Sequence, residues 1–133
     1  MTTRSATHGR LHAAIFVGGV AGALARAGLD EVVPWNGHDW PWSTFLANVA
    51  GTLLLGYVAT RLQERLPPST YRRPLAGTGF CGALTTFSTF QLELIKLVRH
   101  GAAGTAAGYL PASLTAGFVG VYLATALTRR VRL

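Results

Sequence analysis

The sequence predicts an all-α membrane protein in which a single domain, residues 1–133, contains four transmembrane helices. Half of the 133 residues are hydrophobic and only 13% are charged, whereas about a quarter of the residues of a soluble domain are charged. The mean hydropathy is positive, at +0.33. Four apolar segments are separated by polar connections, and each is close to or above the ~20 residues that span a bilayer.

The formal net charge of +7 is distributed in a way that argues against a nucleic-acid partner. The basic residues lie between the apolar segments, where they orient a protein in its membrane. No basic stripe interleaved with aromatic residues is present, as nucleic-acid binding requires. The single cysteine, Cys81, excludes an intramolecular disulfide and a cysteine-based zinc site, and its apolar neighbours predict a buried, inert thiol.

The first predicted span covers residues 11–29 and follows a polar segment, residues 1–10, that we expect to be a flexible tail. Gly18 and Gly22 are four residues apart and form a small-residue face that another helix can approach closely. Arg26 continues this face near the end of the span, where an arginine usually reaches the membrane interface. A cleaved signal peptide is the alternative for this segment, although three further spans follow it.

The second predicted span covers residues 42–62. Thr44, Asn48, Gly51 and Leu55 recur at spacings that place them on one helical face. An asparagine at this depth either joins packed helices, which is the commoner role, or binds a substrate. Three tryptophans typical of a membrane interface gather near the start of this span: Trp35, Trp40 and Trp42.

The third predicted span covers residues 74–98 and contains the most unusual stretch of the chain, residues 79–90. These twelve residues include two glycines, three threonines and a serine, and glycine and threonine both weaken a helix. We expect the helix to break at residues 82–85 and to resume at residues 87–90. Non-helical backbone at membrane depth is tolerated only where it is buried in protein or lines a cavity. This stretch is therefore either a tightly packed helix crossing or the functional site of the protein.

The fourth predicted span covers residues 102–128, in which Tyr109 and Ser113 lie four residues apart on one face. Near the end of the third span, Glu93 is a functional candidate because acidic residues are costly in a membrane. Its simpler role is that of an interfacial partner for the basic residues that follow it.

The distribution of basic residues predicts that both termini are cytoplasmic. Four spans place the termini and the second connection on one side, and leave only Lys96 and Arg99 on the other. This excess predicts a multi-pass protein of the cell membrane with one orientation. The first side carries nine arginines: Arg4, Arg10, Arg61, Arg65, Arg72, Arg73, Arg129, Arg130 and Arg132.

No pattern typical of an enzyme is present in the sequence. No nucleophile lies at a recognisable spacing from a base, and His8 and His12 are four residues apart only in the predicted tail. Gly77, Gly79 and Gly82 match a dinucleotide-binding pattern in letters alone, because no strand in a βαβ unit precedes them.

The polar side chains within the spans are mostly neutral hydrogen-bond donors, which suit an anion. Phe87 and Phe90 stand among them, and the positive edge of a phenyl ring can face a small anion where hydroxyls are missing. Backbone carbonyls at the predicted break could hold a cation, as unwound helices do in transporters. The donors are Thr44, Asn48, Thr85, Thr86, Ser88, Thr89, Tyr109 and Ser113.

Residues 79–90, GFCGALTTFSTF, resemble the signature of the Fluc (CrcB) family of fluoride channels. Two differences from the family pattern are Ala83, where many members have glycine, and Pro111 in the fourth span. Three further motifs agree, so that the resemblance covers all four spans in the family's order: Gly19-x-x-Gly22-Ala-x-x-Arg26, Pro41-x-x-Thr44-x-x-x-Asn48-x-x-Gly51 and Tyr109-x-x-x-Ser113.

The resemblance implies a dimer of antiparallel four-helix subunits with two narrow fluoride pores. Phe87 and Phe90 would face fluoride with their ring edges, Asn48 would donate to it, and hydroxyls would continue a polar track. The residues implied for the pore are Asn48, Phe87, Ser88, Thr89, Phe90, Tyr109 and Ser113.

The resemblance also implies two accessory sites. Arg26 would lie at the mouth of a vestibule that concentrates anions, and Thr44 belongs to the same vestibule. Backbone carbonyls of Gly82 and Thr85 would hold a structural Na⁺ at the centre of the dimer.

The function that we expect is passive export of cytoplasmic fluoride, which lowers its toxicity. A proton-coupled four-helix exporter is one alternative, with Glu93 as its single candidate acid. A non-transporting membrane scaffold is another, but it leaves Phe87 and Phe90 beside the hydroxyls unexplained. The uneven basic residues argue against insertion in both orientations, so we expect an oppositely oriented homologous partner, with a homodimer as the alternative.

Overall fold

The computed structural model describes residues 2–62 and 71–131, and all regular secondary structure in these two ranges is helical. Three of the helices, α1, α2 and α5, are long and apolar enough to cross a membrane, so the all-helical membrane class predicted from the sequence is confirmed. The elements are α1 (Thr2–Val32), α2 (Trp42–Thr60), the π-helical η2 (Pro74–Cys81), the short α3 (Gly82–Leu84), α4 (Ser88–Arg99) and α5 (Ala103–Arg130).

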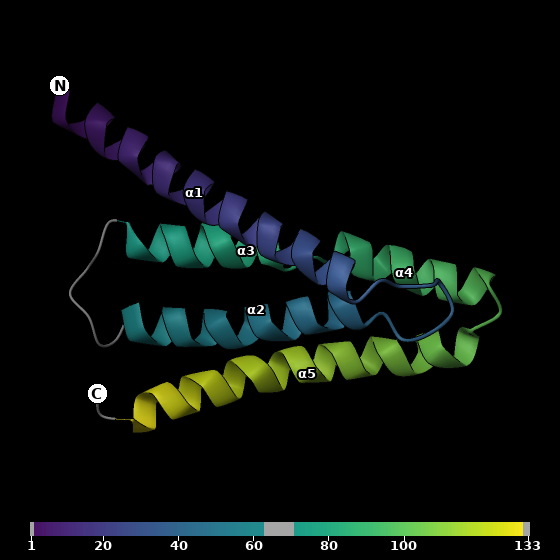
Figure 1. Cartoon of the computed structure of the whole chain (residues 1–133). Coiled ribbons are helices and arrows are strands. Elements are labelled where there is room, and N and C mark those ends of the chain that lie inside the picture. Colours follow the sequence, from purple (N-terminus) through teal and green to yellow (C-terminus); the bar gives the residue numbers. More distant parts are fainter. Residues whose placement is uncertain (1, 63–70, 132–133) are drawn as a thin grey trace.

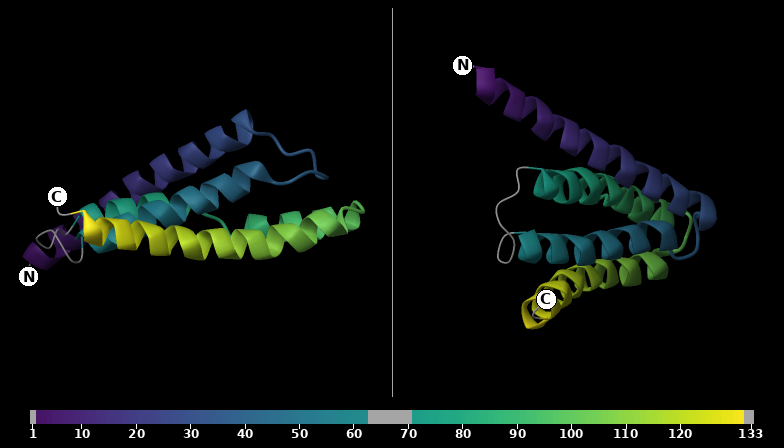
Figure 2. Two further views of the ribbon diagram at one scale, coloured as in Figure 1. Left: turned by 90° about the horizontal axis from the view of Figure 1, so that it is seen from below. Right: turned by 60° about the vertical axis from the view of Figure 1, so that its left-hand side comes forward.

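The helices form an elongated bundle in which α1 begins and α5 ends at the same end, here called the terminal end (Figure 1). The connection from α1 to α2 and the turn from α4 to α5 lie at the opposite end, here called the loop end. Segments η2, α3 and α4 follow one another along the bundle in place of a single third helix. Helix α1 crosses the others obliquely, and its N-terminal half diverges from them (Figure 2).

Helix α1 is longer than the sequence predicts. It begins at Thr2, so residues 2–10 of the segment that we expect to be a flexible tail, residues 1–10, are helical. The segment contains no proline and only one glycine. Once a helix has formed, each added residue gains one hydrogen bond at little further cost, so the helix extends backwards from its apolar part without a signal to stop it.

Glycines allow α1 and η2 to pack with their backbones in contact, as the spacing of Gly18 and Gly22 predicts. A methyl group added at Gly18 would lie 2.0 Å from the carbonyl oxygen of Leu75, and one at Gly22 would lie 2.3 Å from that of Phe80. From the opposite side, a methyl group at Gly79 would lie 2.5 Å from a backbone oxygen of α1. In a membrane the hydrophobic effect does not drive helices together, because lipid tails are as apolar as the side chains. Small residues instead allow the helices to approach closely and to gain van der Waals contacts.

The largest buried side chains lie toward the loop end, where α4 meets α5. Leu97 and Tyr109 are fully buried, and His100 Nδ1 lies 3.0 Å from the carbonyl oxygen of Gly37, which joins the two connections of the loop end. Partly buried tryptophan and phenylalanine side chains from the start of α2 surround this core. Its members are Phe90, Leu97, Ala106 and Tyr109, with Trp35, Trp40, Phe45, Leu94 and Ala102 packed against them.

The Gly18→Ala substitution should lower the stability of the protein by about 1–3 kcal/mol, the usual cost of overpacking, because its methyl group collides with the backbone of η2. The neighbouring Gly19→Ala substitution is the matched control, since nothing lies within 4 Å of its added methyl group. Thermal unfolding in detergent, followed by circular dichroism, measures both variants. Equal midpoints for the two variants would contradict the close packing of α1 on η2.

Candidate functional site

The helical path stops between α3 and α4, and the side chain of Asn48 takes over the hydrogen bonds of the backbone there. Thr85 is extended, with φ −81° and ψ 155°. Asn48 Nδ2 donates to the carbonyl oxygen of Thr86 at 3.1 Å, and the Thr86 N–H donates to Asn48 Oδ1 at 2.8 Å. One amide on α2 thereby satisfies both polar groups of a residue that has left the helix, as membrane depth requires.

At this interruption, two backbone N–H groups that would continue an α-helix donate to side chains instead. In an α-helix each N–H bonds the carbonyl four residues earlier, so Thr86 would pair with Gly82 and Thr89 with Thr85. Instead the Thr86 N–H donates to Asn48, and the Thr89 N–H donates to Thr86 Oγ1 at 3.2 Å. The carbonyls of Gly82 and Thr85 therefore lose their usual helical donors.

The position of Gly82 differs from the break expected over residues 82–85. Gly82 has helical dihedral angles, φ −63° and ψ −33°, and the first extended residue is Thr85. The reason is that the departure from the helix is set by Asn48, which reaches Thr86, rather than by the flexibility of glycine.

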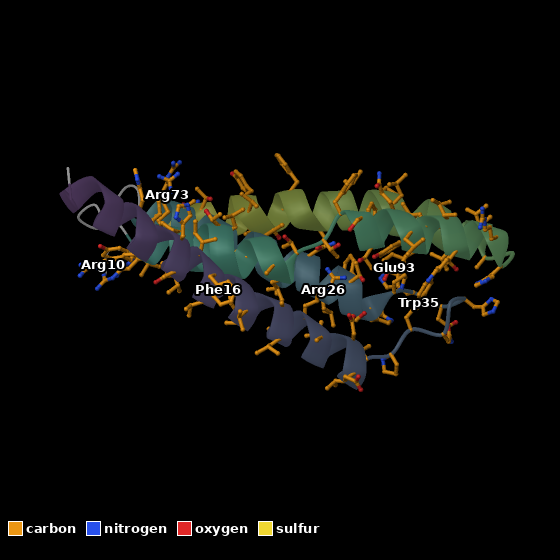
Figure 3. The ribbon with its side chains drawn as sticks, turned by 90° about the horizontal axis from the view of Figure 1, so that it is seen from above. Arg10, Phe16, Arg26, Trp35, Arg73 and Glu93 are labelled. Carbon is orange, nitrogen blue, oxygen red and sulfur yellow. The ribbon has the colours of Figure 1, made fainter. Side chains whose placement is uncertain are left out.

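One guanidinium, one amide and three hydroxyls gather beside this interruption and form what we call the donor cluster: Arg26, Asn48, Thr86, Ser88 and Thr89. Arg26 Nη2 donates to Thr89 Oγ1 at 2.9 Å. Thr86 Oγ1 lies 3.2 Å from Thr89 Oγ1 and 3.3 Å from Ser88 Oγ. Figure 3 shows Arg26 part-way along the bundle, between Arg10 at the terminal end and Trp35 at the loop end.

The two phenylalanines of α4 and its cap lie beside the donor cluster but in different surroundings. Their ring centroids are 6.0 Å apart, at an interplanar angle of 35°. Phe87 is 65% exposed, whereas Phe90 is 4% exposed and its ring centroid lies 5.1 Å from that of Tyr109. Phe90 therefore packs into the core at the loop end, and Phe87 faces out of the helical bundle.

A second polar group, here called the carboxylate cluster, consists of Glu93, Thr44 and Tyr109. Thr44 Oγ1 donates to Glu93 Oε1 at 2.6 Å, and the Tyr109 hydroxyl donates to Glu93 Oε2 at 2.9 Å. Glu93 is only 5% exposed. Hydroxyls from α2 and α5, and not the basic residues of α4 considered in the sequence, are thus the partners of this buried acid.

Two buried side-chain polar atoms in the described ranges 2–62 and 71–131 have no hydrogen-bond partner: Trp40 Nε1 and Ser113 Oγ. Ser113 was a predicted site residue. Trp40 was predicted only as part of an interfacial aromatic belt, because its place before the second span gives no sign that its nitrogen is buried.

An open groove of about 530 Å³ runs along the outside of the interruption. Gly82 and Phe87 are exposed along this groove, and Thr85, whose backbone is extended, lies between them. Its lining includes Asn48, Gly51, Gly82, Thr85, Thr86 and Phe87. No group of three or more histidine, cysteine, aspartate or glutamate side chains that could hold a metal ion occurs among the residues described.

Comparison with known proteins identifies relatives that match almost the whole chain. The model of a family described as "CrcB-like protein, Camphor Resistance (CrcB)" matches residues 13–125. A protein of Mycobacterium tuberculosis named "Fluoride-specific ion channel FluC 1" is 56% identical over 121 residues, which cover 91% of this chain and 92% of the relative.

Two further relatives carry similar names. "Fluoride-specific ion channel FluC 1" of Mycolicibacterium paratuberculosis is 55% identical over 120 residues, which cover 90% of this chain and 91% of the relative. "Fluoride-specific ion channel FluC 3" of Streptomyces avermitilis is 40% identical over 126 residues, which cover 91% of this chain and 62% of the relative.

The Asn48→Ala substitution should destabilise the protein by at least about 2 kcal/mol, because it leaves the N–H and carbonyl of Thr86 without partners and each such group costs about 1–3 kcal/mol. The Asn48→Asp substitution keeps an acceptor for the Thr86 N–H but loses the donor, so we expect an intermediate loss. Unfolding midpoints in detergent measure both. An unchanged midpoint for Asn48→Ala would show that the interruption does not depend on this amide.

Proposed function

The chain belongs to the CrcB-like family, and from that membership we propose that it is a fluoride-selective ion channel through which cytoplasmic fluoride leaves the cell passively. It is a transport protein and not an enzyme. Relatives named as channels also favour this function over the proton-coupled exporter and the scaffold considered from the sequence.

The donor cluster is the observation that supports an anion as the permeant species. It combines one guanidinium, one amide and three hydroxyls from α1, α2 and the segment that begins α4, and contains no acid. Polar groups within a membrane are costly and mark ion pathways. The buried acid closest to it in the chain, Glu93, already accepts two hydrogen bonds, so it does not consume the donors of this cluster.

We assign the narrow part of the pore to Asn48, Ser88 and Thr89, flanked by Phe87 and Phe90. The amide nitrogen of Asn48 has two hydrogens and uses one of them for Thr86, so the other is available to an anion. The phenyl rings offer positive edges and exclude water, which strengthens each hydrogen bond to the ion.

The track continues toward the loop end through Tyr109 and Ser113, which α5 places one helical turn apart. Arg26 and Thr44 belong to the vestibule in this assignment. Because the hydroxyls of Thr44 and Tyr109 donate to Glu93 in the present arrangement, an anion that reaches them competes with the carboxylate for their protons.

We infer that Gly82 and Thr85 hold a structural Na⁺ through their carbonyl oxygens. Both carbonyls have lost their usual helical donors to Asn48 and to Thr86, and both residues lie along the open groove. Carbonyls released from an interrupted helix coordinate Na⁺ in transporters, so the residues present fit this ion. Two subunits would together supply four such oxygens.

We propose that the groove receives an oppositely oriented homologous subunit. A side chain as large as Phe87 remains 65% exposed beside polar backbone in one subunit, and a second subunit would cover it and close the pore. The nine-to-two distribution of basic residues favours one orientation for this chain, with both termini cytoplasmic, and hence a heterodimer over a homodimer.

Purified protein in liposomes loaded with fluoride or chloride should release fluoride rapidly and retain chloride, as measured with ion-selective electrodes. A K⁺ gradient with a K⁺ ionophore lets one K⁺ leave for each anion and holds the interior negative, and this potential drives each anion outward with about 2.3 kcal/mol per 100 mV. If neither ion is released, the measurement is repeated with a homologous chain reconstituted in the same liposomes. Fluoride release would then show that the chain needs a partner, and continued absence of release would show that the assignment as a channel is wrong. Equal release of both ions would contradict a fluoride-selective channel.

The Phe87→Ile substitution should reduce fluoride release at least about tenfold, a loss of roughly 1.4 kcal/mol of barrier stabilisation, because an aliphatic side chain has no positive ring edge. Phe118→Ile is the matched control, since Phe118 on α5 is likewise exposed, at 76% against 65% for Phe87. Both variants should have the elution volume of the parent in size-exclusion chromatography and the same unfolding midpoint in detergent. Undiminished release by Phe87→Ile would remove this ring from the pore.

A further inference from the structure

Trp40 combines a partly buried ring with a buried donor that has no partner. It lies at the loop end, and its ring packs edge-on against two aromatic neighbours: the centroid of Tyr109 is 5.2 Å away at 77°, and that of Phe45 is 5.6 Å away at 76°. Its indole nitrogen is buried and has no hydrogen-bond partner in the described residues.

The other two tryptophans do not share this property. Trp35 Nε1 donates to the carbonyl oxygen of Asp39 at 2.7 Å, and Trp42 is 51% exposed. Buried tryptophan nitrogens usually find an acceptor, and a buried donor left without one costs about 1–3 kcal/mol. An orphaned donor in a folded protein therefore suggests an acceptor that is not part of the chain.

The neighbours of Trp40 restrict the nature of that acceptor. The hydroxyl protons of Thr44 and Tyr109 are directed at Glu93, so they are not the unused hydrogen-bonding groups of this region. Of the two buried polar atoms without a hydrogen-bond partner in the described residues, Trp40 Nε1 and Ser113 Oγ, the serine oxygen lies near the Tyr109 hydroxyl, so the indole nitrogen is the group that is left without an acceptor. An indole nitrogen donates only, so its missing partner is an acceptor.

The start of α2, which follows Trp40 by two residues, adds a partial positive charge to this region, and the first turn of the same helix holds the Glu93 carboxylate through Thr44. Trp40 lies two residues before Trp42, the first residue of a 19-residue helix whose N-terminus has no side-chain cap. The aligned peptide dipoles of a helix make its N-terminus equivalent to a partial positive charge, which stabilises an anion within about one turn. A buried donor beside such an end is suited to a small anion more than to a neutral acceptor.

We propose that Trp40 Nε1 is an anion-binding donor of the permeation path, which takes fluoride at the loop end after Tyr109 and Ser113. This inference rests on the proposed channel function and adds a residue that lies outside the sequence motifs. The indole nitrogen receives the ion where the polar track approaches the membrane surface and donates one hydrogen bond during its release.

Nuclear magnetic resonance tests the contact directly. Protein labelled with ¹⁵N-tryptophan gives one indole resonance for each of its three tryptophans, and Trp35→Phe and Trp42→Phe variants assign the third resonance to Trp40 by elimination. Addition of sodium fluoride should shift the Trp40 resonance and leave the other two in place, and the same concentration of sodium chloride should not shift it. An unmoved Trp40 resonance, or an equal shift with chloride, would overturn the proposal.

Flux through liposomes supplies the second measurement. Trp40→Phe keeps an aromatic ring against Tyr109 and Phe45 but removes the N–H, so fluoride release should fall about tenfold, as expected for one lost hydrogen bond to a charged partner. Trp42→Phe is the matched control and should release fluoride at the parental rate.

The two measurements distinguish this proposal from the function on which it rests. Parental fluoride release with an unmoved Trp40 resonance overturns the role of Trp40 alone. Absence of fluoride release from the parent, with and without a homologous partner, overturns the channel and the role of Trp40 together. If Trp40→Phe fails to fold, the titration of the parent still decides.

Discussion

The two hydrogen bonds between the side chain of Asn48 and the backbone of Thr86 are the interaction on which the site depends. The hydrocarbon core of a membrane contains no water to bond an N–H or a carbonyl that has left a helix. A side-chain amide carries its N–H donors and its carbonyl acceptor on separate atoms, so a single residue on α2 can bond the carbonyl and the N–H of Thr86 at once. The bond from the Thr86 N–H to Asn48 releases the carbonyl of Gly82 from its usual helical donor, and the neighbouring Thr86 Oγ1 takes the N–H of Thr89 and thereby releases the carbonyl of Thr85.

Close packing makes this interaction possible. A methyl group added at Gly51, three residues beyond Asn48, would lie 2.2 Å from Cγ2 of Thr85, and one added at Gly22 would lie 3.1 Å from the backbone nitrogen of Leu84. The interrupted segment is therefore held between α1 and α2 with no room for a larger side chain on either helix. Glycine acts here by its small size, which allows the polar groups to reach one another, and not by loosening the third segment.

Periodicity in the sequence predicts the helices and the small-residue faces well, because both follow from residues close together in the chain. Gly18 and Gly22 pack against η2 as their spacing predicts. The same spacing placed Asn48 on a helical face but did not reveal whether it packs or binds, since its partner lies 38 residues away. The surroundings of Glu93 and Trp40 likewise depend on residues far away in the sequence. The hydrogen-bond partners of Glu93 lie on α2 and α5, and the indole nitrogen of Trp40 is buried against α5. Residues 2–10 are helical despite their polar composition, because polar composition alone does not end a helix.

A buried acid beside the proposed anion path is an apparent contradiction, which the contacts of Glu93 resolve. Its two oxygens accept from hydroxyls on different helices, Thr44 on α2 and Tyr109 on α5. Those bonds direct positive hydrogens at the carboxylate and hold Tyr109 between the rings of Phe90 and Trp40. The acid thus fixes the aromatic core of the loop end, while the groups left to donate are ones that it does not reach. In the proposed anion path, the hydrogen bonds from Thr44 and Tyr109 would offset the negative charge of Glu93 where the ion passes it.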